Sequence, residues 1–175
     1  MPKPLWAPWR LEYVEAADDA GRCVFCDPDD ELVVHRGERG FVLLNRFPYT
    51  SGHLLVAPYR HADDLVGLTE DEALEIHRLA AAAVTALRAE YAPDGHNVGW
   101  NLGRAAGAGI VDHVHLHVVP RWSGDTNFMP VLADVRVIPE ALAATAERLR
   151  RRFAAPDEPG NGQGPEVPGP DRTVA

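Results

Sequence analysis

The feature that most constrains this chain is a seven-residue run, residues 113–119, in which histidine and apolar residues alternate. His113, His115 and His117 are separated by single apolar residues. Because successive side chains of a β-strand point to opposite faces, this spacing places three imidazoles on one face and the apolar side chains on the other. A helix would spread the rings over about 200° of its surface, given about 3.6 residues per turn. The pattern therefore predicts a strand that carries a row of histidines.

A row of imidazoles admits three interpretations. Histidines two residues apart on a strand can bind zinc. Alternatively, one neutral imidazole can act as a nucleophile while its neighbours hold phosphate oxygens. The third interpretation, a polar strand face without chemistry, is disfavoured because three histidines on a buried face are costly to satisfy without a function.

Composition limits the partners. With 175 residues the chain is long enough for one domain with a core, and its formal net charge of −9 argues against a nucleic-acid partner. A small anionic ligand is still compatible with this charge if basic groups gather in one cleft. We find no apolar run that could span a membrane and no leader, so we expect a cytoplasmic protein without a membrane partner.

The only two cysteines, Cys23 and Cys26, form one Cys-x-x-Cys motif. A single pair is no disulfide framework and indicates metal or redox chemistry, but no thioredoxin-like pattern surrounds it. His61 and His113 are candidate partners downstream, and two thiolates with two imidazoles suit tetrahedral zinc. Such an ion would be structural, since no coordination position is left open. The alternative is a metal-free, reduced pair.

Short apolar runs, turns and two helical patterns alternate along the chain without a βαβ repeat, which predicts an α+β fold. A capping box at Thr69 begins the first helix. The second helix ends in a run of arginines, which we expect to be solvated and to complement the helix dipole. The expected strands span residues 31–35, 40–45, 53–58, 96–102, 113–119 and 135–138, and the expected helices span residues 69–91 and 139–153.

The two ends of the chain differ in composition. Trp6, Trp9 and Tyr13 make the N-terminal arm too apolar for a free tail, so we expect it to pack on the domain or on another subunit. Residues 154–175 are rich in proline, glycine and acid and contain no aromatic residue, which is typical of disorder. We therefore expect one domain over residues 1–153 and a disordered tail over 154–175.

The run HVHLHVV resembles the signature of the histidine triad (HIT) superfamily, which contains nucleotide hydrolases and nucleotidyl transferases. The resemblance extends from about Trp6 to Phe153. It implies a five-stranded antiparallel sheet with two main helices, assembled as a homodimer or homotetramer. It also implies zinc at Cys23, Cys26, His61 and His113, as in some triad proteins.

The resemblance also implies roles for individual residues. His115 would attack the α-phosphorus of a nucleoside polyphosphate, while His117 and His53 donate to its oxygens. A loop of small residues lets backbone amides approach an anion closely. The nucleotide-binding residues would be Asn45, Asn101, Gly107, Ala108, Gly109, His117 and Trp122. Without the triad, Asn45 reads as a turn residue, His53 as a surface histidine and Trp122 as a core or interface residue.

The motifs WAPWR near the start and RWSGDTNFMPV after the triad look like the bacterial branch with diadenosine tetraphosphate phosphorylase activity. The resemblance thus implies that diadenosine tetraphosphate and inorganic phosphate are converted to ATP and ADP through a nucleotidyl-histidine intermediate. One departure is Gly109, where many relatives have Ser or Gln. It leaves open a hydrolase of dinucleotides or nucleoside phosphoramidates, and a nucleotide-binding module without turnover is the third alternative.

The enzymatic hypotheses share one geometric requirement. The ring of His115 has to be open to a phosphoryl group, with the rings of His117 and His53 beside it.

Overall fold

The computed structural model describes residues 23–125 and 140–154. The N-terminal arm, the expected strand at 135–138 and the expected disordered tail beyond residue 154 lie outside the described residues. None of the helices in the described ranges combines the length and hydropathy that crossing a bilayer requires.

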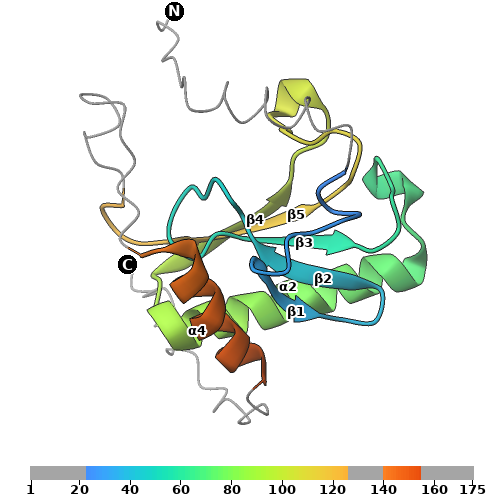
Figure 1. Ribbon diagram of the computed structural model, residues 1–175. Helices are drawn as coiled ribbons and strands as arrows, with labels where there is room; N and C mark the ends of the chain where they lie inside the picture. Colours follow the sequence, from blue (N-terminus) through green and yellow to red (C-terminus); the bar gives the residue numbers. More distant parts are fainter. Residues whose placement is uncertain (1–22, 126–139, 155–175) are drawn as a thin grey trace, which may run out of the picture.

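The described residues form one five-stranded antiparallel sheet and two long helices (Figure 1), as the resemblance to the triad superfamily implied. The strands lie in the order β1-β2-β3-β5-β4, and every neighbouring pair is antiparallel. Two short 3₁₀ turns, η1 and η2, lie between the longer elements. The strands are β1 (Val33–Arg36), β2 (Gly40–Leu44), β3 (Leu54–Pro58), β4 (Gly95–Trp100) and β5 (Leu116–Arg121), and the turns are η1 (Leu65–Gly67) and η2 (Arg104–Ala106).

Helix α2 (Glu70–Tyr91) begins at the predicted capping box. The Thr69 hydroxyl accepts from the backbone N–H of Glu72, whose carboxylate accepts from the N–H of Thr69, so two N–H groups of the first turn are satisfied. The helix ends where Ala92 adopts a left-handed conformation before Pro93. This confirms the start and stop signals read from the sequence.

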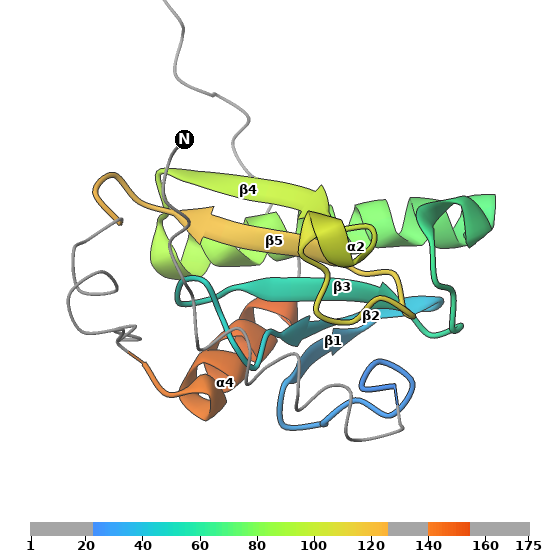
Figure 2. The same cartoon turned by 90° about the horizontal axis from the view of Figure 1, so that it is seen from above.

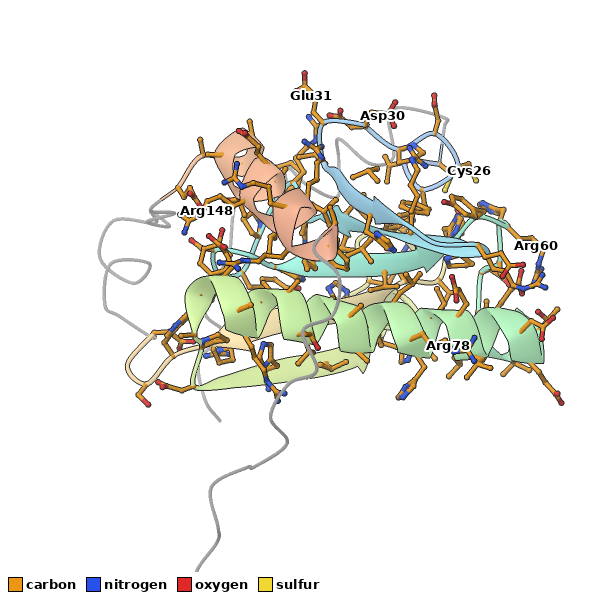
Figure 3. All side chains as sticks on the ribbon, turned by 90° about the horizontal axis from the view of Figure 1, so that it is seen from below. Cys26, Asp30, Glu31, Arg60, Arg78 and Arg148 are labelled. Carbon is orange, nitrogen blue, oxygen red and sulfur yellow. The ribbon has the colours of Figure 1, made fainter. Side chains whose placement is uncertain are left out.

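Helices α2 and α4 (Leu142–Ala154) cover one face of the sheet (Figure 3). The main core lies between them and the strands, because apolar side chains recur at helical spacing on both helices and at alternate positions on the strands. Its buried members include Val42, Leu54, Val56, Ile76, Ala83, Leu87, Leu116, Val118, Ala146 and Leu149.

The arginine run of α4 is not simply solvated, contrary to expectation. Arg148, labelled in Figure 3, pairs with Glu90 of α2 and with Glu140. The guanidinium of Arg150 donates to the backbone carbonyls of Asp30, Glu31 and Val33. These arginines therefore fasten α4 to α2 and to the segment before β1, because their long side chains can reach acceptors on neighbouring elements.

Both long helices of the described residues lie on that one face, so neither α2 nor α4 covers the opposite face (Figure 2). Over β1, β2 and β3 it is covered by a second apolar cluster, into which the Cys-x-x-Cys turn inserts Phe25. The other buried members are Val33, Phe41, Leu43, Leu55 and Ala57. Over β5 and β4 this face presents His117, so the candidate site lies where the apolar cover ends.

The histidine run does not lie entirely within a strand, which corrects the sequence-based expectation. Strand β5 begins at Leu116, so only His117 belongs to the regular ladder. The preceding residues leave the sheet because the backbone N–H of Val114 donates to the carbonyl of Ala62 at 2.7 Å. As a result His113 points to the cysteines, while His115 and His117 stay beside each other.

Candidate active site and metal centre

The ring of His115 is oriented by the backbone of its own segment. Its Nδ1 lies 2.8 Å from the carbonyl oxygen of His113. A carbonyl can only accept, so Nδ1 carries the hydrogen and Nε2 keeps its lone pair. Burial lowers the pKa of His115, which outweighs the opposing effect of this hydrogen bond. The neutral, nucleophilic form of the imidazole is therefore favoured near neutral pH.

A chain of hydrogen bonds fixes the tautomers of His53 and His117. The backbone N–H of Tyr49 and the amide of Asn45 both donate to Nδ1 of His53, at 3.1 and 3.3 Å. The hydrogen of neutral His53 therefore lies on Nε2, which is 3.0 Å from Nδ1 of His117. It follows that neutral His117 carries its hydrogen on Nε2, available for a donor role.

Gly52 places His53 at the start of β3. It has a φ of 77°, and a Cβ there would lie 2.9 Å from Leu87. Since a positive φ and close packing both favour glycine, this turn is sterically specified. His53 follows it fully buried, with its Nε2 on Nδ1 of His117. Its expected donation to a phosphate oxygen stays a prediction.

Two asparagines that the sequence analysis gave as nucleotide-binding residues contact these histidines. Asn45 is buried and donates to His53, while its oxygen accepts from the backbone N–H of Phe47. Nδ2 of Asn101 lies 3.3 Å from Nε2 of His117, and a half-turn of the amide would present its oxygen to the N–H of that ring. Asn101 thus borders the reacting face, whereas Asn45 supports His53 from behind.

The small-residue loop before the triad is folded on itself. The amides of Gly107 and Ala108 donate to the carbonyls of Arg104 and Gly103, at 2.9 and 3.3 Å. Gly107 has a φ of 90°, as expected for a glycine that closes a 3₁₀ turn. These two amides are therefore engaged within the loop, and Gly109 follows them, half-buried, towards His113.

The four predicted metal ligands come together from three segments. Cys23, Cys26, His61 and His113 offer ligand atoms that all lie within 4.8 Å of one another. Nδ1 of His113 is 3.2 Å from the sulfur of Cys23, and Nδ1 of His61 is 3.2 Å from that of Cys26. The donor set suits tetrahedral zinc with no open position. Figure 3 shows Cys26 at the same end of the molecule as Arg60, which precedes His61.

The tautomer of His113 also fits a metal. Its Nε2 lies 3.0 Å from the carbonyl oxygen of Pro58, so Nε2 carries the hydrogen and the lone pair of Nδ1 faces the cysteines. Burial lowers the pKa of His113 to about 4, which keeps the ring neutral. The row of histidines is thus divided: His113 belongs to the metal centre, and His115 and His117 belong to the reacting site.

The two centres are in contact. Phe25, between the two cysteines, is fully buried, and its ring lies 5.2 Å from that of His113 and 4.7 Å from that of His115. The ring of His115 lies 4.9 Å from that of His117. Only 5% of the surface of residue His115 is exposed. The companions that the hypothesis requires are therefore in place, and the opening at His115 itself is small.

A shallow trough of about 390 Å³ begins at His117 and runs over β5 and β4, on the face of the sheet opposite α2 and α4 (Figure 2). Tyr49 borders it and stacks on His117 at 6.2 Å and on His53 at 4.8 Å. The remaining lining residues are Asn97, Val98, Gly99, Trp100, Asn101, Val119 and Arg121.

Comparison with known families identifies the family of this chain. Residues 28–124 match the family model of the HIT domain. The chain belongs to the histidine triad (HIT) family. The HIT signature is the run of histidines that the fold divides between the two centres.

Relatives of this HIT protein include an enzyme and structurally described proteins. An AP-4-A phosphorylase of Mycobacterium tuberculosis is 37% identical over 163 residues, which covers 86% of this chain and 84% of that protein. A Zn-bound histidine triad family protein of Mycobacterium smegmatis superposes with a TM-score of 0.62 at 29% identity, over 77% of this chain and 94% of that one. A HIT family protein of Bacillus anthracis is 34% identical with a TM-score of 0.55, over 59% and 75% of the two chains.

The HIT site contains residues that the sequence did not single out. Tyr49 stacks on His117, and the ring of Phe25 packs at a tilt against that of His115. Only the position of Phe25 within Cys-x-x-Cys hinted at its contact. Trp122 follows β5 half-buried and does not line the trough. Its expected role in nucleotide binding remains a prediction.

Proposed function

We propose that this HIT protein is a nucleotidyl transferase that cleaves dinucleoside polyphosphates, converting diadenosine tetraphosphate and inorganic phosphate to ATP and ADP. The observation that carries the proposal is the pair of opposed tautomers: His115 presents a lone pair on Nε2, and His117 beside it presents an N–H on Nε2. One nucleophile and one acid, with ring centroids 4.9 Å apart, suit displacement at phosphorus. The kinship with an AP-4-A phosphorylase supports the choice of substrate.

In the first step Nε2 of His115 forms a bond to the α-phosphorus, and the bond from that phosphorus to the bridging oxygen breaks. The bonding electron pair leaves with the bridging oxygen as nucleoside triphosphate. His115 keeps its hydrogen on Nδ1, and the carbonyl of His113 stabilises the positive charge that the ring acquires. In the second step an oxygen of inorganic phosphate attacks the same phosphorus and releases ADP and neutral His115.

His117 is suited to assist both steps. Its Nε2–H can donate to an oxygen of the reacting phosphate or to the departing oxygen, while His53 donates to its Nδ1. Asn101 holds the edge of the His117 ring, and Tyr49 covers its face. The two rings thereby keep their orientation through the reaction.

We also propose that Cys23, Cys26, His61 and His113 hold a structural zinc ion, which when bound would fasten three segments of the chain together. The zinc-bound relative supports this assignment. A homo-oligomeric assembly completes the proposal.

The decisive experiment is product analysis of diadenosine tetraphosphate with and without inorganic phosphate. The proposal expects ATP and ADP in its presence and no turnover in its absence. AMP and ATP formed without phosphate would instead identify a hydrolase. His115→Ala should abolish turnover, with His77→Ala, an exposed histidine of α2, as the control. Full activity of the His115 variant would exclude the covalent mechanism.

A further inference from the structure

The trough that begins at His117 continues along β5 away from His115. On β5 the side chains of His117, Val119 and Arg121 alternate on the face opposite α2 and α4, and on β4 they face Gly99, Asn97 and Gly95. From residue 117 to residue 121 a strand extends about 14 Å, at about 3.4 Å per residue. The trough therefore links the candidate acid to a guanidinium through a length that several joined phosphates can occupy.

Gly99 keeps the near end of this trough open. It lies opposite His117 in the register of β4 and β5, and a Cβ built on it would meet no atom within 4 Å. Every other residue type would place a side chain above the sheet at this point. The open space beside His117 thus follows from a single glycine in the edge strand.

Arg121 closes the far end. It is the only arginine or lysine among the described residues that line the trough, in a chain whose formal net charge is −9. Its guanidinium donates to both carboxylate oxygens of Asp125 and, at 3.1 Å, to the amide oxygen of Asn97. These contacts hold a side chain that is still 44% exposed, so it is oriented before a ligand arrives.

The position of the trough relative to His115 indicates which part of the substrate the trough would bind. In displacement at phosphorus the entering and leaving atoms lie roughly in line on opposite sides. His117 lines the trough and its ring centroid lies 4.9 Å from that of His115, which does not line it. We therefore place the departing group on the trough side. The ribose oxygen and the two other oxygens that stay on the phosphorus lie roughly perpendicular to that line, so the retained nucleoside is directed away from the axis of the trough.

Building on the proposed function, we infer that this trough binds the leaving polyphosphate, with Arg121 clamping a phosphate remote from the scissile bond. Asp125 and Asn97 take three of the five N–H groups of Arg121, so one N–H on each terminal nitrogen is left to donate to phosphate oxygens. The clamp selects substrates by their leaving group: a polyphosphate long enough to reach from His117 to Arg121 gains an ionic contact, and a short leaving group does not.

The test compares two substrates of the same adenylyl group. Diadenosine tetraphosphate has a nucleoside triphosphate as its leaving group, whereas the 4-nitrophenyl ester of AMP has a small one. Arg121→Gln should lower kcat/KM for the tetraphosphate about tenfold, the loss expected for one charge-assisted contact, and leave that for the ester within about twofold. Arg39→Gln is the matched control, since Arg39 is an equally exposed arginine paired with Asp71. It should change neither value.

A steric variant tests the near end. Gly99→Val should lower kcat/KM for the tetraphosphate more than for the ester, while Gly67→Val, at another position where a Cβ meets nothing, should have no effect. Inorganic tripolyphosphate should inhibit the unmodified protein competitively, and Arg121→Gln should raise its inhibition constant about tenfold. Circular dichroism and thermal melting verify that each variant is folded.

Two results would overturn the inference: equal losses for both substrates in Arg121→Gln, or an inhibition constant for tripolyphosphate that Arg121→Gln leaves unchanged. Failure of the underlying function has a different signature, because His115→Ala would then retain turnover of both substrates. If His115→Ala is inactive and Arg121→Gln does not discriminate, the chemistry stands and the subsite is wrong.

Discussion

At the residue scale the site depends on which nitrogen of each imidazole carries a hydrogen. His53 has no access to solvent, yet it determines the tautomer of His117 through one hydrogen bond of 3.0 Å. Its own tautomer is set in turn by the backbone N–H of Tyr49. A buried residue can therefore control the acid through a hydrogen bond.

We expect His53→Asn to lower kcat about tenfold to a hundredfold, with little change in KM, because His117 would lose the donor that orients it. The measurement is steady-state turnover of diadenosine tetraphosphate, with melting temperature as a check on folding. His96→Asn is the control, a half-buried histidine of β4 that does not line the trough. If the two variants behave alike, the orienting role of His53 is wrong.

Residue spacing made part of this site predictable. The period of two placed His115 beside His117, and the cysteine spacing with two later histidines indicated the four metal ligands that the structure brings together. The contacts of Tyr49 and Phe25 could not be predicted, because they arise only when a turn and a loop fold over the sheet. Neither leaves a periodic signal in the sequence.

At the element scale the predicted helices and strands that fall within the described residues match the structure except at their ends. The strand of the triad starts three residues later than its pattern suggested, because the pairing of Val114 with Ala62 competes with the sheet ladder. Alternation of apolar residues predicts on which face of the sheet a side chain lies. It does not predict which backbone group forms the hydrogen bond. The capping box of α2 is purely local, which explains why its prediction held.

The N-terminus of α2 makes stability depend on pH. The guanidinium of Arg60 beside Glu72, helped by the N–H of Thr69, lowers the pKa of this carboxyl from 4.5 to about 2. A lowered pKa in the folded state stabilises the protein above pH 4.5, and this contribution is lost as the pH falls from 4.5 towards 2. Allowing for the exposure of Arg60, we expect Glu72→Gln to cost about 1–2 kcal/mol at pH 7.

Urea denaturation at several pH values measures this contribution. The difference in unfolding free energy between the unmodified protein and Glu72→Gln should shrink below pH 4.5 and nearly vanish near pH 2. Glu70→Gln, exposed in the same turn, should differ little from the unmodified protein at any pH. A difference for Glu72→Gln that persists unchanged in acid would contradict the ion pair with Arg60.

The Cys-x-x-Cys turn is the element that a metal would fasten. We expect one zinc per chain by mass spectrometry, and removal by a chelator should lower the melting temperature on the order of 10 °C, since the ion binds only the folded chain. His61→Asn should abolish binding of the ion, whereas His77→Asn should not. A purified protein without metal that melts at the same temperature with and without added zinc would refute the site.

At the scale of the whole molecule the sheet ends in an exposed strand. β4 pairs only with β5 among the described strands, and its side chain at Val98 is 51% exposed. Beside it, a groove of about 560 Å³ runs between β4 and α2, lined by apolar side chains that include Ile76, Val84 and Trp100. Unpaired strand edges next to apolar surface are normally covered, because they otherwise promote aggregation.

We therefore expect two copies of the chain to associate through β4 and α2. A second antiparallel β4 would satisfy the free backbone groups of the edge and bury Val98 together with the groove. Sedimentation velocity should give at least twice the monomer mass of 19.1 kDa for the unmodified protein and the monomer mass for Val98→Asp, because a buried, unpaired carboxylate opposes association. Val66→Asp, at a more exposed valine in η1, should leave the assembly intact. A monomeric unmodified protein, or an oligomer that tolerates the aspartate, would place the interface elsewhere.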